Sequence, residues 1–442
     1  MALENRLIFR LYQVAANLLG PPAVLAASLK GRFGGRWRER LGWVPVWRPT
    51  SRPRIWIHGA SVGEVRSAEA VILALLAQNP EVEIGLTAAT PAGLAMAAQL
   101  WAGHRRVKTL TAPLDFWGAP QRFIDRLRPS VLVIMETELW PNLIRQARQS
   151  GLILVLAAAR LTERSFQRYR LAQASMADLL GCFDLIAPSG PREGDLFAAL
   201  GAPAERLTIL GNPKFDRLAA ETASPAFEAQ KAAWFARLWG AGPRGRLLAA
   251  GSTHPGEEAE VLGASEKLLA ADSGLTLLLA PRHLSRVDEV LALARRRRLT
   301  ALPAGQLPAS QTDQGPQAAR ARVVVLDSLG QLTSLYALAD LALVGGSLRP
   351  GLTGHNPLEP AAAAAPMLFG RFMASFASEA AGLLQAGGAR ETGPETLAED
   401  LTYWLGHQAE ARQMARAARL YLETRSPAGP ALARAILTRL TH

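Results

Sequence analysis

Acidic side chains that follow short apolar runs are the first candidates for chemistry in this sequence. The segment HGASVGE at residues 58–64 places Glu64 at the start of a helical pattern, and the segment ETELWPN at residues 136–142 places Glu136 and Glu138 after another apolar run. A positioned carboxylate can accept a proton from a substrate hydroxyl. Glu64 is therefore a candidate general base, and Glu136 and Glu138 are candidates for holding a cation or sugar hydroxyls.

Both acidic segments also have a purely structural interpretation. Ser61 and Glu64 have the spacing of a capping box, in which the serine accepts from a backbone N–H and the glutamate reaches back, with Gly63 between them. Glu136 and Glu138 also fit solvated loop charges, although such a loop gives no reason for the neighbouring aromatic Trp140. The residues alone leave these alternatives open.

A lysine provides a third candidate. Only five of the 49 basic residues are lysines, so Lys214, in the segment GNPKFD at residues 211–216, hints at a compact point charge rather than an arginine fork. A surface lysine in a turn is the alternative.

Anion-binding features gather in the second half of the chain. Ser252 lies in the small-residue segment GSTHPGE at residues 251–257, which precedes a helical pattern and offers backbone N–H groups to a phosphate. Arg282 follows the next apolar run, directly after Pro281. A tight turn at the glycines, and a pairing of Arg282 with a helix acid, are the alternatives.

The segment GHNPLE at residues 354–359 has the pattern of a helix start. Asn356 is expected at the N-cap, Pro357 at the first helical position and Glu359 at the third. The cap does not explain His355 or the glycines before it. A helix N-terminus for phosphate, with an acid one turn in for ribose hydroxyls, predicts a nucleotide site in outline.

Parallel βαβ units must position these residues, because short aliphatic runs alternate with longer helical patterns from residue 54 onward. The runs predict strands at residues 54–58, 82–87, 107–110, 131–135, 152–156, 184–187 and 207–210, then at 246–250, 275–279, 323–326, 341–344 and 367–369. Residues 302–321 are predicted to form a surface loop. Two Rossmann-like halves that face each other would bring their strand ends, and thus ligands, to a shared cleft.

Length and composition agree with a two-domain globular protein. The 442 residues are 49% apolar and 19% charged, which excludes one small module and a disordered chain. We expect an N-terminal segment at 1–53, a first domain at 54–215, a linker at 216–244 and a second domain at 245–442, whose last helix is a candidate for crossing back. The single cysteine, Cys182, excludes an internal disulfide and fits a reducing compartment.

The N-terminal segment combines an uncharged stretch with a basic cluster. Residues 11–29 carry no charge, but polar residues and a proline pair interrupt them, so neither a transmembrane helix nor a secretory signal is expected. Residues 30–54 contain eight basic residues and one acid, +7 of the net charge of +12, with three tryptophans interleaved. This pattern favours an anionic membrane surface over a solvated basic loop. The other basic residues are scattered, so nucleic acid is not an expected partner.

Six segments, in this order along the chain, resemble motifs of the 3-deoxy-D-manno-octulosonic acid (Kdo) transferases. They are HGASVGE at 58–64, ETELWPN at 136–142, GNPKFD at 211–216, GSTH at 251–254, PRH at 281–283 and GHNPLE at 354–359. The resemblance implies a GT-B glycosyltransferase fold of two Rossmann-like doubly wound domains facing a central cleft. It also implies transfer of Kdo from CMP-Kdo to a lipid A precursor, lipid IVA, at the cytoplasmic face of the bacterial inner membrane.

The resemblance further implies roles for individual residues. Glu64 would be the proton acceptor, while Glu136 and Lys214 would stabilise the transition state of a single, inverting displacement. CMP would be held by Pro281, Arg282, Leu329, Gly330, Gln331, Asn356, Pro357, Leu358 and Glu359. Neither a metal nor another cofactor is implied. Gln331 stands where the family often has glutamate, and Thr353 where it often has glycine, so contacts to the nucleotide are expected to differ there.

Two other functions fit part of the sequence. A GT-B enzyme with a UDP-linked donor, either another glycosyltransferase or a sugar-nucleotide epimerase, fits the fold. A membrane-surface scaffold without chemistry fits the basic segment. The six short motifs favour the Kdo transferase over both.

Overall fold

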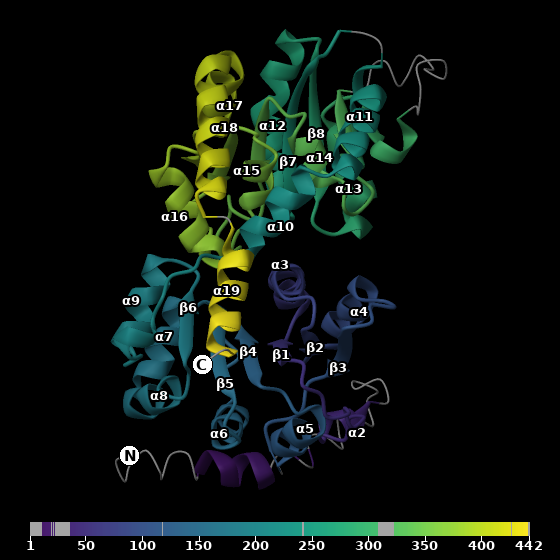
Figure 1. Cartoon of the computed structure of the whole chain (residues 1–442). Helices are drawn as coiled ribbons and strands as arrows, with labels where there is room; N and C mark the ends of the chain where they lie inside the picture. Colours follow the sequence, from purple (N-terminus) through teal and green to yellow (C-terminus); the bar gives the residue numbers. More distant parts are fainter. Residues whose placement is uncertain are drawn as a thin grey trace. The chain divides into compact units, whose positions relative to one another are not determined.

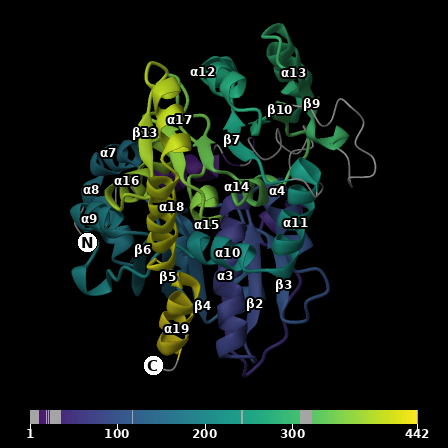
Figure 2. The ribbon, with the colours of Figure 1, turned by 90° about the horizontal axis from the view of Figure 1, so that it is seen from above.

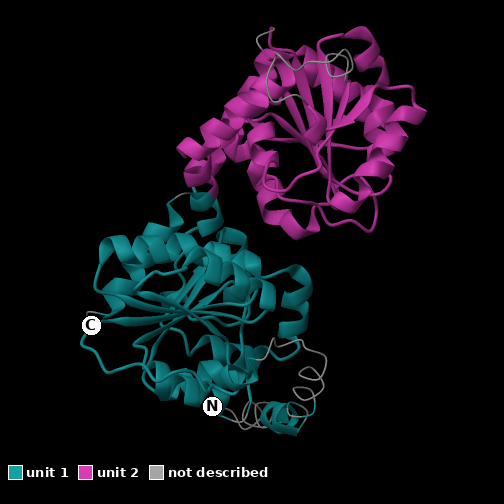
Figure 3. Cartoon of the chain, turned by 90° about the vertical axis from the view of Figure 1, so that its right-hand side faces the viewer, with its two compact units in different colours: residues 1–217, 425–442 teal, residues 218–424 magenta. Residues whose placement is uncertain are grey.

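The computed structural model describes residues 11–18, 20, 22, 36–116, 118–240, 243–307, 322–425 and 427–440, which fall into two compact units (Figure 3). Unit 1 comprises Met1–Arg217 and Arg425–His442, and unit 2 comprises Leu218–Thr424. Each unit is a parallel sheet covered by helices, which confirms the predicted α/β fold class of two Rossmann-like domains. Arg425–His442 belongs to unit 1, so the last helix crosses back to the first unit, for which it was a candidate.

The described strands of unit 1 form a six-stranded parallel sheet in the order β3-β2-β1-β4-β5-β6 (Figure 1). Their bounds are β1 Arg54–Gly59, β2 Glu83–Ala88, β3 Val107–Thr111, β4 Val131–Met135, β5 Ile153–Ala159 and β6 Leu185–Pro188. The chain runs outward from β1 to β3 and then returns to β4, so the strand order reverses between β1 and β4. Ligands of doubly wound sheets bind at such a reversal, outside the carboxyl ends of the strands.

Helices cover both faces of this sheet, which explains why its strands are continuous apolar runs rather than alternating ones. They are α2 Trp37–Arg40, α3 Val62–Gln78, α4 Pro91–Leu100, α5 Ala119–Leu127, α6 Pro141–Gln149, α7 Glu163–Arg170, α8 Gln173–Leu180, α9 Pro191–Ala199 and α19 Ala428–Leu440. Helix α10, Pro213–Thr222, begins in unit 1 and ends in unit 2. The C-terminal helix α19 packs against α3 (Figure 2), and the Gln78 amide donates to the Pro430 carbonyl at 3.0 Å. The predicted strand at 207–210 is wrong, because Leu207 forms only an isolated bridge with Ile186.

The described strands of unit 2 form a parallel sheet in the order β13-β12-β11-β7-β8-β10-β9. Their bounds are β7 Arg246–Thr253, β8 Leu275–Pro281, β9 Ala301–Pro303, β10 Val323–Val325, β11 Leu341–Val344, β12 Met367–Gly370 and β13 Arg390–Thr392. The order reverses between β7 and β11. Strand β9 occupies the start of the predicted loop, whose residues 308–321 lie outside the described part, and β13 was not predicted.

The helices of unit 2 surround this sheet (Figure 1). They are α11 Pro225–Trp239, α12 Glu257–Ala271, α13 Val287–Arg296, α14 Leu332–Tyr336, α15 Leu358–Ala362, α16 Ala377–Gln385, α17 Leu397–Gly406 and α18 Gln408–Glu423. Residues 216–244, predicted as a linker, are mostly helical in α10 and α11.

Part of the predicted membrane segment is packed onto unit 1. Arg40 is buried and donates to the carbonyls of Ala89 and Ala112, while Arg54 is buried and pairs with Glu83. These two arginines are therefore structural rather than membrane-facing. Among the described residues, the structure contains no helix whose length and apolar character would suffice to cross a membrane.

Candidate functional site

Glu64 lies at the carboxyl end of β1, beside the reversal of strand order in unit 1. Helix α3 begins after the N-cap Ser61, whose hydroxyl accepts a hydrogen bond from the Glu64 N–H at 3.4 Å. The Glu64 carboxylate accepts from the Ser61 hydroxyl at 3.2 Å and from the backbone N–H of Ala60. The predicted capping interaction is thus present, with the carboxylate reaching Ala60 rather than the N-cap N–H.

The surroundings of Glu64 keep its carboxyl group close to half-protonated at neutral pH. Burial, followed by the negative charge of Glu136, raises the pKa of Glu64 to about 7, and Glu138 contributes in the same direction. The hydrogen bonds from Ala60 and Ser61 oppose this shift. A carboxyl group with a pKa near the working pH is suited to general base catalysis, because it can both accept and release a proton.

Glu136 and Lys214 form an ion pair at the carboxyl end of β4. Lys214 Nζ lies 2.6 Å from Glu136 Oε1, and their side chains are only 26% and 17% exposed. Glu136 has a φ of +58°, in the left-handed region that non-glycine residues rarely adopt. Backbone strain of this kind persists where the surroundings fix it and is common at functional sites. Glu136 and Lys214 therefore form one ion pair whose backbone position is fixed by its surroundings.

Glu138 has a different partner from Glu136. Its carboxylate accepts from the indole N–H of Trp140 at 2.7 Å, and burial raises the pKa of Glu138. The Trp140 ring also lies 5.0 Å from the ring of His58, a buried residue whose side chain contacts Thr87. Burial lowers the pKa of His58 to about 4, so its ring is neutral. Trp140 therefore orients Glu138, which explains the aromatic residue beside the acids.

The residues around Lys214 shape the turn that presents it. The Asn212 side chain accepts from the Lys214 N–H at 3.0 Å, and Asp216 accepts from the backbone N–H groups of Ala428 and Gly429 at the start of α19. Asn212 and Asp216 thus hold the backbone of the turn from which the Lys214 side chain reaches Glu136.

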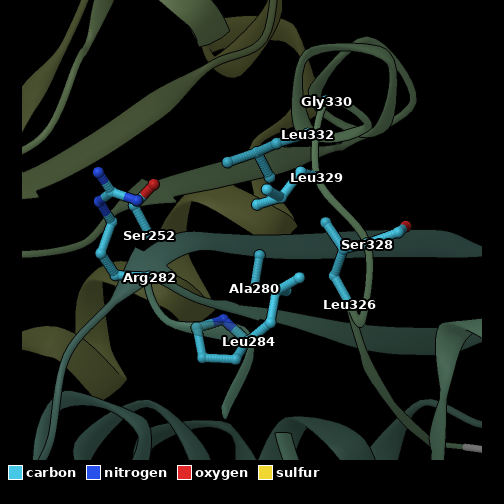
Figure 4. A pocket seen from close by; sticks show the side chains of 10 residues that line it. Ser252, Ala280, Arg282, Leu284, Leu326, Ser328, Leu329, Gly330 and Leu332 are labelled. Carbon is cyan, nitrogen blue, oxygen red and sulfur yellow. The ribbon is translucent and has the colours of Figure 1, made fainter. Parts of the chain in front are cut away.

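Unit 2 has a pocket at the carboxyl ends of β8 and β10 (Figure 4). It is lined by Ser252, Ala280, Pro281, Arg282, Leu284, Leu326, Ser328, Leu329, Gly330 and Leu332. Four of the nucleotide contacts predicted from sequence are therefore brought together here, namely Pro281, Arg282, Leu329 and Gly330.

A second pocket shares Ser252 and Arg282 with the first. It is lined by Ser252, Arg282, Tyr336, Val344, His355, Asn356, Glu359 and Phe376. Ser252 has a φ of +57°, so this unit also places a non-glycine residue in the left-handed region at its candidate site. The guanidinium of Arg282 suits a phosphate oxygen where the two pockets adjoin.

Two histidines form a direct contact at the second pocket. The Nε2 atoms of His254 and His355 lie 2.8 Å apart, and the rings stack with centroids 5.0 Å apart. One of the two facing nitrogens must donate and the other accept, because a hydrogen bond needs one N–H and one lone pair. Burial, and then the neighbouring His254 and Arg282, lower the pKa of His355 to about 4, so His355 is neutral at physiological pH.

The glycine-rich segment after β11 does not offer free N–H groups to an anion. The carboxylate of Glu257 is fully buried. It accepts hydrogen bonds from the backbone N–H groups of His254, Gly346, Ser347 and Leu348 at 2.7 to 2.9 Å. Close packing accounts for the glycines, since a Cβ at Gly345 would lie 2.7 Å from the Ser252 carbonyl oxygen. An internal carboxylate thus occupies the place that a phosphate would need.

The predicted helix start at residues 354–359 is displaced by one residue. Helix α15 is only five residues long, and its N-cap is Pro357 rather than Asn356. The Asn356 side chain still accepts from the Leu358 N–H at 3.1 Å and donates to Glu359 at 3.3 Å. Asn356 and Glu359 line the second pocket, whereas Pro357 and Leu358 are buried and line neither.

Gln331 also lines neither pocket. Its side-chain oxygen accepts from the amide of Gln230 at 2.8 Å and from the indole of Trp234 at 2.9 Å, both on α11. Tyr336 and Phe376 also line the second pocket and were not predicted from the sequence. The glycine at position 251 indicates that another group packs closely there, because a Cβ at residue 251 would overlap the Tyr336 hydroxyl.

No cluster of three or more histidine, cysteine or acidic side chains with the geometry of a metal site occurs in the described ranges.

Comparison with known proteins gives consistent matches. A family model described as 3-deoxy-D-manno-octulosonic-acid transferase (kdotransferase) matches residues 35–217. A 3-deoxy-D-manno-octulosonic acid transferase of Haemophilus influenzae is 32% identical over 379 residues, 84% of each chain. One from Bordetella pertussis is 32% identical over 403 residues, 88% of this chain and 89% of the relative.

Among solved structures, the UDP-GlcNAc 2-epimerase of Neisseria meningitidis bound to UDP-GlcNAc is similar with a TM-score of 0.61. The match covers 88% of this chain and 99% of the epimerase at 13% sequence identity. At that identity the likeness concerns the fold alone, and it agrees with a GT-B-like fold built of two Rossmann-like domains.

Proposed function

Because the chain belongs to the 3-deoxy-D-manno-octulosonic acid (Kdo) transferase family, we propose that it transfers Kdo from CMP-Kdo to a lipid A precursor, lipid IVA, with Glu64 as general base. Kdo transfer in lipopolysaccharide biosynthesis follows from the family. The acceptor, the base and the roles of single residues are the proposal.

The environment of Glu64 is the main observation that supports the proposal. The carboxyl group lies at the end of β1, two hydrogen bonds hold it in place, and its pKa is raised to about 7. In the proposed step, the acceptor hydroxyl gives its proton to Glu64 while its oxygen attacks the anomeric carbon of Kdo. The bond to the CMP phosphate breaks at the same time, so that CMP leaves with the bonding electron pair.

The charges of the departing phosphate need cationic partners. Arg282 lines both pockets of unit 2, which supports a role at the phosphate, and Glu359 in the second pocket supports a role at the ribose hydroxyls. Lys214, already paired with Glu136, is the proposed cation of unit 1. With these groups the proposed displacement requires no metal, so a chelator should leave turnover unchanged.

We also propose that the first part of unit 1 lies on the anionic cytoplasmic face of the inner membrane. Residues 11–18 are helical and expose Leu11, Val14 and Leu18, and Trp37 and Trp43 are about half exposed. Apolar and aromatic side chains beside arginines suit the headgroup region of a bilayer. Binding to vesicles that contain phosphatidylglycerol, but not to neutral ones, tests this location.

Mass spectrometry of a defined reaction tests the activity. Purified protein is incubated with CMP-Kdo and a tetraacylated lipid A precursor, and the mass of the lipid is expected to increase by one or more Kdo units. A parallel thermal-shift measurement compares CMP with UDP, and stabilisation by CMP alone is expected.

The Glu64→Ala variant tests whether Glu64 is needed for transfer and not for folding. It should remain folded, keep CMP binding in unit 2 and lose transfer. The matched Glu69→Ala variant, on the same helix α3, should transfer Kdo like the wild type. Wild-type turnover by Glu64→Ala would remove Glu64 from the mechanism, and stabilisation by UDP instead of CMP would contradict the donor.

A further inference from the structure

Helix α7 presents a basic surface beside the acidic loop of unit 1. Arg164 and Arg168 lie one helical turn apart and are exposed, and neither forms an ion pair within the described part of the chain. The one acid of this helix, Glu163, accepts from Gln167 at 2.9 Å and lies 3.9 Å from Arg192. Like charges four residues apart destabilise a helix, so an anion between the two arginines would be stabilising.

Arginine spacing alone does not identify a binding site. Arg412 and Arg416 on α18 have the same spacing and exposure, and they too lack an ion pair among the described residues. Helix α7 differs from α18 because it lies beside the loop that carries Glu136 and Glu138. This second pair therefore serves as a matched control rather than as a second candidate.

Two contacts connect α7 to the candidate catalytic loop. The Thr137 hydroxyl, between Glu136 and Glu138 in sequence, donates to the carbonyl oxygen of Arg160, three residues before α7 begins. Burial, and then the charge of Glu138, raise the pKa of Tyr169, whereas Arg168 lowers it, so Tyr169 lies within electrostatic range of both. Helix α7, with Arg168, is therefore held beside the loop that carries Glu136 and Glu138.

The inner face of α7 fixes the orientation of these arginines. Phe166 and Tyr169 pack against the same core cluster as Trp140, the residue that orients Glu138. At 100° per residue, Arg164 and Arg168 share a face that points away from Phe166 and Tyr169. The arginines thus project from a helix that is anchored to the site through its opposite face.

We propose that Arg164 and Arg168 bind a phosphate monoester of the acceptor lipid and thereby position its hydroxyl group at the acidic site of unit 1. This inference rests on the proposed function, because it assumes a phosphorylated lipid as acceptor. Guanidinium groups suit a phosphate because their planar donors can form paired hydrogen bonds with its oxygens. The same acids that activate a hydroxyl would repel a phosphate, so a separate cationic surface next to them is needed to hold an anionic acceptor.

Acceptor kinetics of a charge-neutralised variant test this inference. The Arg164→Gln/Arg168→Gln variant is compared with wild type and with the matched Arg412→Gln/Arg416→Gln variant. Each protein is assayed with a bisphosphorylated tetraacylated precursor and with the same lipid after phosphatase treatment. We expect the α7 variant to raise the KM for the phosphorylated acceptor roughly tenfold and to leave the KM for CMP-Kdo unchanged. Its KM for the dephosphorylated lipid should equal that of the wild type.

Vesicle binding distinguishes an acceptor phosphate from membrane headgroups. Without acceptor, the α7 variant should bind phosphatidylglycerol vesicles as the wild type does. A parallel loss of vesicle binding, or an equal effect on both acceptors, would assign these arginines to the membrane and overturn the inference. An unchanged KM for the phosphorylated acceptor in an active enzyme would overturn the inference alone. A wild-type protein without transferase activity would overturn the proposed function, and the inference with it.

Discussion

Lys214 Nζ lies 2.6 Å from Glu136 Oε1, which joins two motifs that are far apart in the sequence into one ion pair at the end of β4. The pair includes both residues to which the family resemblance assigns transition-state stabilisation. The negative charge of Glu136 is the second-largest cause, after burial, of the raised pKa of Glu64. The three residues therefore form one electrostatic system.

Removing the cation from this pair should reduce catalysis more than stability. We expect Lys214→Met to lower kcat by roughly 10- to 100-fold, the usual effect of losing one charge-assisted hydrogen bond. The loss of folding stability should be on the order of 1 to 2 kcal/mol, because the mostly buried Glu136 carboxylate loses its partner. Single-turnover rates and thermal unfolding measure the two effects.

A second lysine–glutamate pair provides the control for this substitution. Lys231 Nζ lies 2.6 Å from Glu228 on α11, outside both pockets. Lys231→Met should leave kcat unchanged. An equal loss in both variants would mean that the effect of Lys214 is not specific to the site.

The pH dependence of turnover should report the ionisation of Glu64. Only the carboxylate can accept a proton, and the pKa is about 7, so kcat/KM should fall about tenfold per pH unit below pH 7 and level off above it. Glu136→Gln removes one repelling charge and should move this limb to lower pH, provided that activity remains measurable. A limb that stays in place in Glu136→Gln would contradict the coupling.

The same ionisation should affect folding stability. The pKa of Glu64 is about 7 in the folded chain and 4.5 without the fold, so the folded state binds this proton more tightly. The resulting stabilisation is fully present below pH 4.5 and is lost as pH rises through 7. The Tm of Glu64→Gln relative to wild type should therefore increase between pH 4.5 and pH 8. A constant difference over this range would show that the pKa of Glu64 is not raised.

Much of the fold follows from local patterns in the sequence. Continuous aliphatic runs predict the buried strands, and the reversals of strand order then fall beside the segments that carry Glu64 and Glu136 in unit 1 and Ser252 in unit 2. Short-range signals therefore suffice to place the candidate site residues at strand ends, because polar residues there interrupt an otherwise apolar pattern.

Long-range partners explain what the sequence could not predict. Glu257 and the amides of Gly346 and Ser347 are separated by about 90 residues, so no local pattern indicates that a carboxylate fills the glycine-rich turn. The same holds for Gln331, whose side chain is engaged by Trp234. Residues 207–210 have a strand-like composition, but only one bridge to β6 forms. In each case the local structure is determined by hydrogen bonds between residues far apart in the sequence and not by local propensity.

Glu257 should be among the most important residues for the stability of unit 2. Glu257→Ala would leave four backbone N–H groups without their acceptor in a buried place, at a cost on the order of 3 to 6 kcal/mol. Denaturant unfolding measures this loss. Glu260→Ala, on the same helix, removes only an ion pair of 3.7 Å with Arg349 and should cost less than about 1 kcal/mol. Equal midpoints for the two variants would contradict this role of Glu257.

Arg282 should determine how strongly unit 2 binds the phosphate of the donor nucleotide. Its side chain lines the pocket of Figure 4 and also the second pocket. A charge-assisted hydrogen bond contributes about 1.5 to 3 kcal/mol. Arg282→Gln should therefore raise the Kd for CMP by roughly 10- to 100-fold in titration calorimetry, and cytidine without the phosphate should bind both proteins equally. Arg295→Gln on α13 removes an exposed arginine that lines neither pocket and should bind CMP like the wild type. Equal losses of CMP and cytidine binding in Arg282→Gln would mean that Arg282 supports the shape of the pocket instead of contacting the phosphate.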